Sequence, residues 1–134
     1  LWFREDKWSL LPATVFPHAD CALEDKNGER MAMIITERSQ IPLPTLREIA
    51  LQSFLREGSE YRVAEDQRIN VNGTEGLLLK IDALVDGMPV AYLNAYFSTP
   101  GGTFQVVTYT AYNLFDPYRN DLMELISGFV LPEP

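Results

Sequence analysis

Residues 76–112 read GLLLKIDALVDGMPVAYLNAYFSTPGGTFQVVTYTAY, and this stretch decides the fold. Apolar residues from Leu77 to Val85 recur at every second position, the period of a β-strand with one apolar face. Asp86-Gly87 and Pro100-Gly101-Gly102 interrupt the stretch, and such residues accept the backbone angles of tight turns. Strands joined by tight turns run antiparallel, so residues 76–112 predict a three-stranded meander.

Shorter strands are expected before the meander. Asn27-Gly28 lies between Asp20–Glu24 and Met31–Glu37, and this arrangement predicts a hairpin. Asn72-Gly73 marks a further turn, preceded by a short strand near Tyr61–Val71. Together with the meander, these segments predict a sheet of about six strands.

A first helix is predicted at about 45–57. Thr45 and Glu48 have the spacing of a capping box, in which each side chain bonds the other residue's backbone N–H. Gly58 is placed to end the helix in a left-handed conformation. The residues expected on its buried side are Leu46, Ile49, Ala50 and Phe54.

A second helix is predicted at about 117–127. Asp116 is expected to cap its N-terminus, and Pro117 suits the first helical position because proline lacks the N–H that would be unpaired there. The residues expected on its buried side are Tyr118, Leu122, Leu125, Ile126 and Phe129.

The order of these elements predicts the α+β class: an antiparallel sheet of about six strands, with the meander at 76–112, covered by two main helices. A length of 134 residues fits a single domain, residues 1–134. The chain begins with Leu1 rather than methionine, so we expect it to be cut from a longer chain.

Charge and residue types exclude several classes of function. The formal net charge of −8 argues against binding a nucleic-acid backbone, which requires a basic surface. One cysteine cannot form an internal disulfide, and one histidine with one cysteine cannot build an ordinary zinc site, so no metal or cofactor is expected. No membrane span is expected, because such a span needs about 20 predominantly apolar residues without a turn. Both the bacterial cell envelope and the cytoplasm stay open as locations.

Two short segments invite a chemical interpretation beside a structural one. His18 and Cys21 are close enough in sequence to suggest a base and a thiolate nucleophile, but Pro17 before the histidine favours a surface loop that enters a strand. Asp25–Glu29 offers oxygen ligands and a glycine, but it lacks the alternating acids of a calcium loop, which favours a charged hairpin tip.

The most distinctive segment runs from Gly87 to Phe115 and contains no charged residue. Central strands covered on both faces would have this composition. Alternatively, the segment presents an uncharged face to a partner, since tyrosine combines a large contact area with a polar tip. The residues of that candidate binding face are Tyr92, Asn94, Tyr96, Thr108 and Thr110.

The order of elements and the placement of apolar residues resemble the PsbP-like superfamily, which includes Mog-type and DcrB-like domains. The segments that carry the resemblance are Trp8 with Leu11-Pro12, the helix Thr45–Glu57, Ile69–Gly73, Gln105–Thr110, and Phe115 followed by Leu125–Phe129. The resemblance implies an α/β/α sandwich around an antiparallel sheet and a non-catalytic role. It implies no shared catalytic residues.

Two functions therefore follow from the sequence. The first is a non-enzymatic protein-binding, adaptor or assembly-type module, whose partner is another protein or a neighbouring domain of the same chain. The alternative is a small-molecule or lipid-binding domain, or a weak hydrolase, with a pocket under the helices near His18. A deep apolar pocket with a few polar groups would favour the alternative, and a broad exposed aromatic patch would favour the first.

Overall fold

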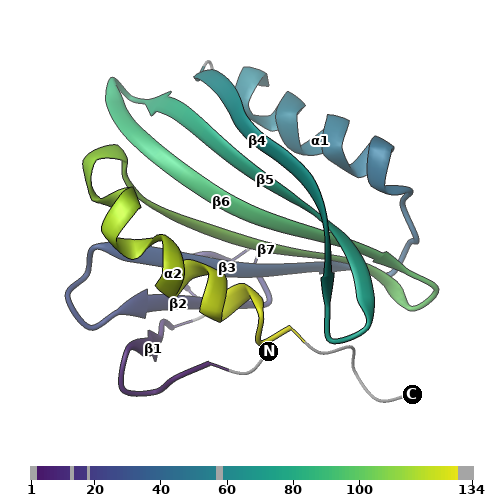
Figure 1. The fold of residues 1–134 in the computed structure, drawn as a ribbon, viewed down its shortest axis with the longest axis horizontal. Coiled ribbons are helices and arrows are strands. Elements are labelled where there is room, and N and C mark those ends of the chain that lie inside the picture. The colour runs from purple at the N-terminus through teal and green to yellow at the C-terminus, as the bar shows by residue number, and fades with distance from the viewer. Residues whose placement is uncertain (1–2, 13, 18, 57–58, 130–134) are drawn as a thin grey trace.

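In a computed structural model that describes residues 3–12, 14–17, 19–56 and 59–129, the chain forms one antiparallel sheet with two helices (Figure 1). The strand order is β1-β2-β3-β7-β6-β5-β4. The elements are β1 (Trp8–Leu10), β2 (Cys21–Asp25), β3 (Arg30–Glu37), α1 (Leu43–Arg56), β4 (Glu60–Val71), β5 (Thr74–Val85), β6 (Met88–Thr99), β7 (Gly102–Ala111), the 3-10 turn η1 (Tyr112–Leu114) and α2 (Phe115–Ile126).

The predicted meander is confirmed as strands β5, β6 and β7. Asp86 and Gly87 both adopt positive φ angles, 51° and 78°, as the tight β5–β6 turn requires. The pairing continues without a shift from Val85↔Met88 to Gly76↔Phe97. At Gly76, an added Cβ would lie 2.7 Å from the Phe97 ring, so only glycine fits beside this buried phenylalanine.

The sheet has seven strands in the described residues, not about six. The predicted hairpin of β2 and β3 is present, and β1 adds a three-residue strand at its outer edge. Strand β4 is long rather than short, and its pairing with β5 shifts between Val63 and Glu65, which marks a β-bulge at Ala64.

Helix α1 begins at Leu43, two residues before the predicted start, so Thr45 lies inside the first turn and the predicted cap is wrong. The Leu46 N–H already donates to the Pro42 carbonyl at 2.9 Å, which closes the turn without a side-chain cap. The predicted Gly58 C-cap lies outside the described residues. The buried side consists of Leu46, Leu51 and Phe54, with Ala50 half-buried, whereas the predicted Ile49 is 44% exposed.

Helix α2 begins at Phe115 rather than 117, because the 3-10 turn η1 runs directly into it. Leu114 occupies the capping position without a side-chain bond, so the predicted Asp116 cap is also wrong. Asp116 instead lies in the first turn, where a carboxylate interacts favourably with the helix dipole. Of the predicted buried residues, Tyr118 is half-buried, and Leu122, Leu125, Ile126 and Phe129 are buried.

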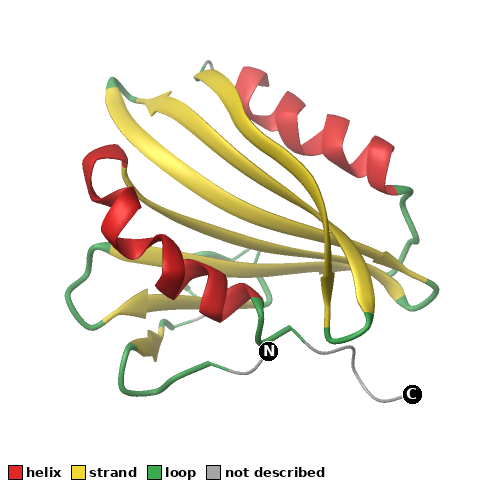
Figure 2. Cartoon of the chain, in the orientation of Figure 1, coloured by secondary structure: helices red, strands yellow, loops and turns green. Residues whose placement is uncertain are grey.

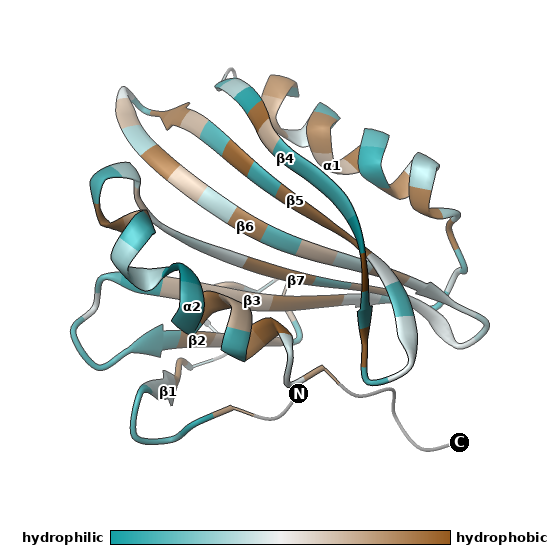
Figure 3. Ribbon diagram, viewed as in Figure 1, coloured by the Kyte–Doolittle hydropathy of each residue, from teal (hydrophilic) through white to brown (hydrophobic). Residues whose placement is uncertain are grey.

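Each helix covers one face of the sheet (Figure 2). Brown, hydrophobic positions alternate with paler and teal ones along the central strands in Figure 3, as expected when successive residues face opposite sides. Helix α2 packs on a core that includes Leu78, Leu93, Phe97 and Val106. Helix α1 packs on a smaller core, built mainly from alternate residues of β5: Leu77, Leu79, Ile81 and Ala83. No helix in the described ranges is long and apolar enough to cross a membrane.

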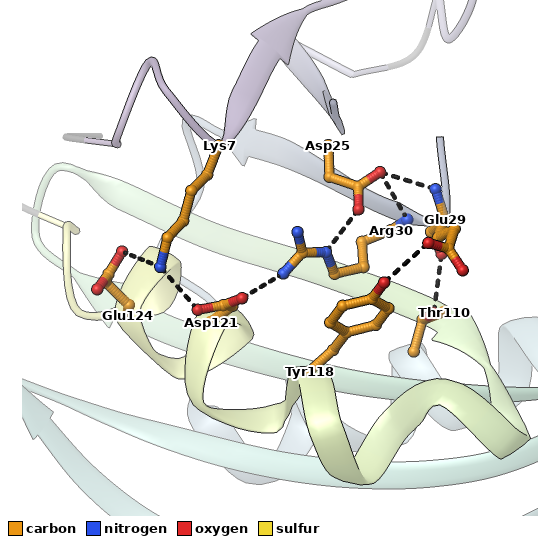
Figure 4. Close-up of polar contacts among 8 residues, drawn as sticks. All are labelled: Lys7, Asp25, Glu29, Arg30, Thr110, Tyr118, Asp121 and Glu124. Atoms are coloured by element: carbon orange, nitrogen blue, oxygen red, sulfur yellow. Dashed lines mark hydrogen bonds and ion pairs between the residues drawn. The ribbon is translucent and has the colours of Figure 1, made fainter. Parts of the chain in front are cut away.

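A buried arginine joins the β2–β3 hairpin to helix α2 (Figure 4). The Arg30 guanidinium donates to Asp25 at 2.7 Å and to Asp121 of α2 at 2.6 Å. Lys7 pairs with the other oxygen of Asp121 at 2.8 Å, and this contact ties the segment before β1 to the same helix. The Arg30 guanidinium also lies 4.1 Å from the centre of the Tyr118 ring. These contacts satisfy both buried charges, as buried ions require.

The arginine contacts predict an acid-sensitive contribution to stability. Burial raises the pKa of Asp25, but hydrogen bonds from the Arg30 side chain and from the backbone of Arg30 and Glu29 outweigh it and hold this pKa below the ordinary aspartate value. A lowered folded pKa stabilises the protein above the unfolded value of about 4 and loses this effect as the pH falls through the folded value.

We therefore expect Asp25→Asn to lower the free energy of unfolding by about 2 kcal/mol at pH 7 and to flatten its decline below about pH 4. Urea unfolding between pH 7 and pH 3 measures both effects. Asp86→Asn, in the exposed β5–β6 turn, is the control and should keep the full acid dependence. An unchanged acid limb in Asp25→Asn would contradict the assignment.

Candidate functional site

A groove of about 330 Å³ lies between helix α1 and the strands β3, β6 and β7. It exists because α1 packs over β4, β5 and part of β6 and does not extend over β3 and β7. Its volume falls within the range of about 300–1,000 Å³ that is typical of small-molecule sites. The groove is therefore the main candidate site on this face of the sheet.

The floor of the groove follows the strand register. Tyr96 of β6 pairs with Gln105 of β7, which pairs with Ile35 of β3. In the next row, Asn94 pairs with Val107, and Val107 pairs with Met33. Residues that are paired across a sheet point to the same face, so these two rows form one surface that is apolar toward β3 and polar toward β6.

Helix α1 forms the wall. Ile49, Ser53 and Arg56 line the groove and recur at helical spacing, with Ala50 and Phe54 beside them. The Phe54 ring meets the Tyr92 ring edge to face, with a centroid distance of 5.1 Å, and this contact seats the C-terminal half of the helix against β6. The Ser53 hydroxyl donates to the Ala50 carbonyl at 2.6 Å.

The polar part of the floor is a hydrogen-bonded pair of buried side chains. Asn94 donates from Nδ2 to the Tyr96 hydroxyl at 3.1 Å, and its Oδ1 accepts from the Thr108 backbone N–H at 3.2 Å. Burial raises the pKa of Tyr96 to about 12, although the Asn94 hydrogen bond lowers it. Tyr96 therefore stays a neutral hydroxyl throughout the physiological range.

The structure brings three of the five predicted site residues together and separates the other two. Tyr92, Asn94 and Tyr96 all line the groove. Thr108 and Thr110 lie on the opposite face of the sheet, where Thr108 pairs with Leu93 and Thr110 with Ala91, both in the core under α2. The Thr108 hydroxyl donates to the Leu93 carbonyl, and the Thr110 hydroxyl donates to the Glu29 carbonyl.

The five residues do not form one exposed aromatic patch. Tyr92 is half-buried, and the other four are buried. The burial of those four side chains matches the first interpretation of this segment, that of central strands covered on both faces. That Tyr92, Asn94 and Tyr96 bind a partner stays a prediction.

Several lining residues were not singled out from the sequence as site residues: Met33, Ile35, Gln105 and Val107 on the floor and Arg56 on the wall. The useful signal is the register of the β6–β7 hairpin, which places odd-numbered residues of β7 beside even-numbered residues of β6. Whether Arg56 faces the groove depends on how α1 packs on the sheet, and nothing in the sequence indicates it.

The two segments with a chemical interpretation lie elsewhere. His18 is outside the described residues, so its relation to Cys21 and to a pocket stays untested. Cys21 is half-buried, and burial chiefly raises the pKa of its thiol, which disfavours the thiolate that a nucleophile needs. Asp25 is held by Arg30, and no group of three or more His, Cys, Asp or Glu side chains in the described ranges is arranged to hold a metal ion.

Comparison with known proteins shows the fold. No family model and no curated protein matches the chain. Among solved structures, it is similar to cyanobacterial PsbP (CyanoP) from Synechocystis sp. PCC 6803, with a TM-score of 0.71 and 13% identity over 96% of this chain and 84% of that one. It is also similar to PA94 from Pseudomonas aeruginosa, a protein of unknown function described as a candidate regulator. That match has a TM-score of 0.64 and 15% identity, covering 98% of this chain and 87% of that one. The fold is therefore PsbP-like.

The buried floor of the groove predicts a contrast between two substitutions at one position. Tyr96 is 1% exposed, so Tyr96→Asp would bury an unpaired carboxylate and should lower the free energy of unfolding by roughly 3–5 kcal/mol. Tyr96→Phe removes one hydrogen bond and should cost about 1 kcal/mol.

Tyr112→Asp is the control, because Tyr112 is 51% exposed and the change should stay within about 0.5 kcal/mol. Chemical denaturation measures all three variants. Equal, small losses for both Tyr96 variants would show that the floor is open to water.

Proposed function

We propose that this chain is a non-enzymatic binding module that takes a small, largely apolar ligand into the groove beneath α1. The observation that supports this function is the combination of an apolar surface from β3 and β7 with the polar pair Asn94 and Tyr96. Sites for small molecules typically have this composition: mostly apolar lining, with a few polar groups that orient the ligand.

The side chains of the groove favour binding over catalysis. Its described lining residues include no histidine, cysteine or carboxylate. The Ser53 hydroxyl is hydrogen-bonded within its own helix, and no base is placed beside it among these residues. Nucleophilic catalysis needs a nucleophile and a base within hydrogen-bond reach, so the weak-hydrolase alternative has no support in this groove.

The family assignment belongs to the same proposal. The PsbP-like fold supports placing the chain in the PsbP-like superfamily, with its Mog-type and DcrB-like members. A non-catalytic role is what that resemblance implies. The activities of individual members are not transferred to this chain.

A protein partner is the second candidate, supported by a different surface. Leu84, Met88 and Tyr112 are large, exposed apolar side chains, 41%, 65% and 51% exposed. Leu84 and Tyr112 line a shallow depression of about 470 Å³ with Pro89, and Met88, the first residue of β6, directly precedes Pro89. Such a surface suits another protein or a neighbouring domain of the same chain. If a protein partner binds this surface, Met88→Lys should weaken its binding, whereas a substitution in the groove should not.

The groove assignment predicts opposite outcomes for two substitutions on one helix. Ile49 lines the groove, and Leu55 lies on α1 outside it; they are 44% and 56% exposed, so aspartate is tolerated at both positions. With octanol as a neutral apolar probe, Ile49→Asp should raise the dissociation constant roughly tenfold through lost apolar contact.

Leu55→Asp is the matched control and should leave the dissociation constant unchanged. Titration by amide NMR measures both, with the largest shifts expected at Ile35 and Val107. Equal affinities in the two variants, or shifts confined to the α2 face, would refute the proposed site.

A further inference from the structure

The groove beneath α1 has a charge opposite in sign to that of the whole chain. The sequence carries 19 acidic and 11 basic residues, a formal net charge of −8. Among the described lining residues of the groove, the one charged side chain is Arg56. An anionic group that approaches this acidic protein therefore finds a positive charge at the groove.

Arg56 is available for an external partner. It lies in the last turn of α1, and in the described part of the chain it forms no ion pair or side-chain hydrogen bond. Arg47, on the same helix, is instead paired with Asp66 of β4 at 2.9 Å. Of these two α1 arginines, only Arg56 combines a place on the groove with a guanidinium that has no partner among the described residues.

The remaining lining offers an apolar bed and neutral donors. Met33, Ile35 and Val107 form the apolar floor opposite Ile49. The half-buried Gln105 offers an uncharged amide donor beside this floor, whereas the Tyr96 hydroxyl is buried and accepts a hydrogen bond from Asn94. The described lining residues contain no carboxylate that would repel an anion.

We propose that the ligand is a small amphipathic carboxylate. Its alkyl body lies on Met33, Ile35 and Val107, and its carboxylate pairs with the Arg56 guanidinium, an arrangement that matches the planar geometry of both groups. A cavity of about 330 Å³ suits a short acyl chain rather than a folded partner. This inference rests on the proposed function and adds the charge of the ligand to it.

The test compares octanoate, octanol and octylammonium, which share one alkyl chain and differ in charge. Octanoate should bind the wild-type protein roughly two- to fivefold more tightly than octanol, the ratio expected for a partly exposed ion pair. Octylammonium should bind more weakly than octanol. Arg56→Gln should make octanoate and octanol bind with equal affinity, because the charge that distinguishes the two probes is removed.

Arg47→Gln is the matched control and should leave the preference for octanoate intact, because Arg47 does not line the groove. A role of Arg56 confined to stabilising the helix end would lower the melting temperature of Arg56→Gln without changing the ratio of affinities, and that result would overturn the inference. Equal binding of octanoate and octanol by the wild-type groove would overturn it as well and leave the proposed function standing. Failure of all three probes to shift Ile35 and Val107 would refute the groove itself.

Discussion

The alternation of side chains along β6 is the constraint on which the rest of the structure depends. Leu93, Ala95 and Phe97 enter the core under α2, and Asn94 and Tyr96, between them, point to the face that α1 partly covers. The same strand thus builds one dry core and the floor of a groove. A shift of one residue in its pairing would exchange these two sets, placing the asparagine in the core and the phenylalanine in the groove.

The arginine side chains on the two faces of the sheet differ in what they contact. Arg30 is enclosed by Asp25, Asp121 and the Tyr118 ring, and this arrangement fixes the N-terminal strands to α2. Arg56, on the other face, is not engaged in this way by the described residues. Arg30 therefore contributes to the packing of α2 on the sheet, whereas Arg56 makes no such contact within the described residues. Rigid attachment of β3 through Arg30 also holds Met33 and Ile35, on its other face, in position.

The sequence predicted local features better than features that depend on packing. The meander was recognisable because glycine turns separate strands with clear alternation. The position of β4 was also predicted, near Tyr61–Val71, but the bulge at Ala64 was not, because it depends on how β4 pairs with β5. Thr45 resembled an N-terminal cap. The helix begins two residues earlier, at Leu43, because Pro44 is tolerated in the first helical turn. Of the predicted site residues, Tyr92, Asn94 and Tyr96 lie along one groove, and their role in binding stays a prediction. Thr108 and Thr110 lie on the other face, because the register of β6 with β7 decides which residues face the groove.

The bulge in β4 affects whether the edge of this sheet can pair with a strand of another molecule. β4 is the outermost strand at one end of the sheet, where unsatisfied backbone groups could recruit a strand from another chain. Before the bulge, Arg62 points to the α2 side, where it meets Asp82; after the bulge, Asp66 points to the α1 side, where it meets Arg47. Even-numbered residues of β4 therefore face the α2 side before the bulge and the α1 side after it. A regular strand can keep its hydrogen-bond register with β4 only on one side of the bulge. This one-residue irregularity therefore disfavours continuous pairing of another strand along the twelve-residue edge, the kind of pairing that builds fibrils.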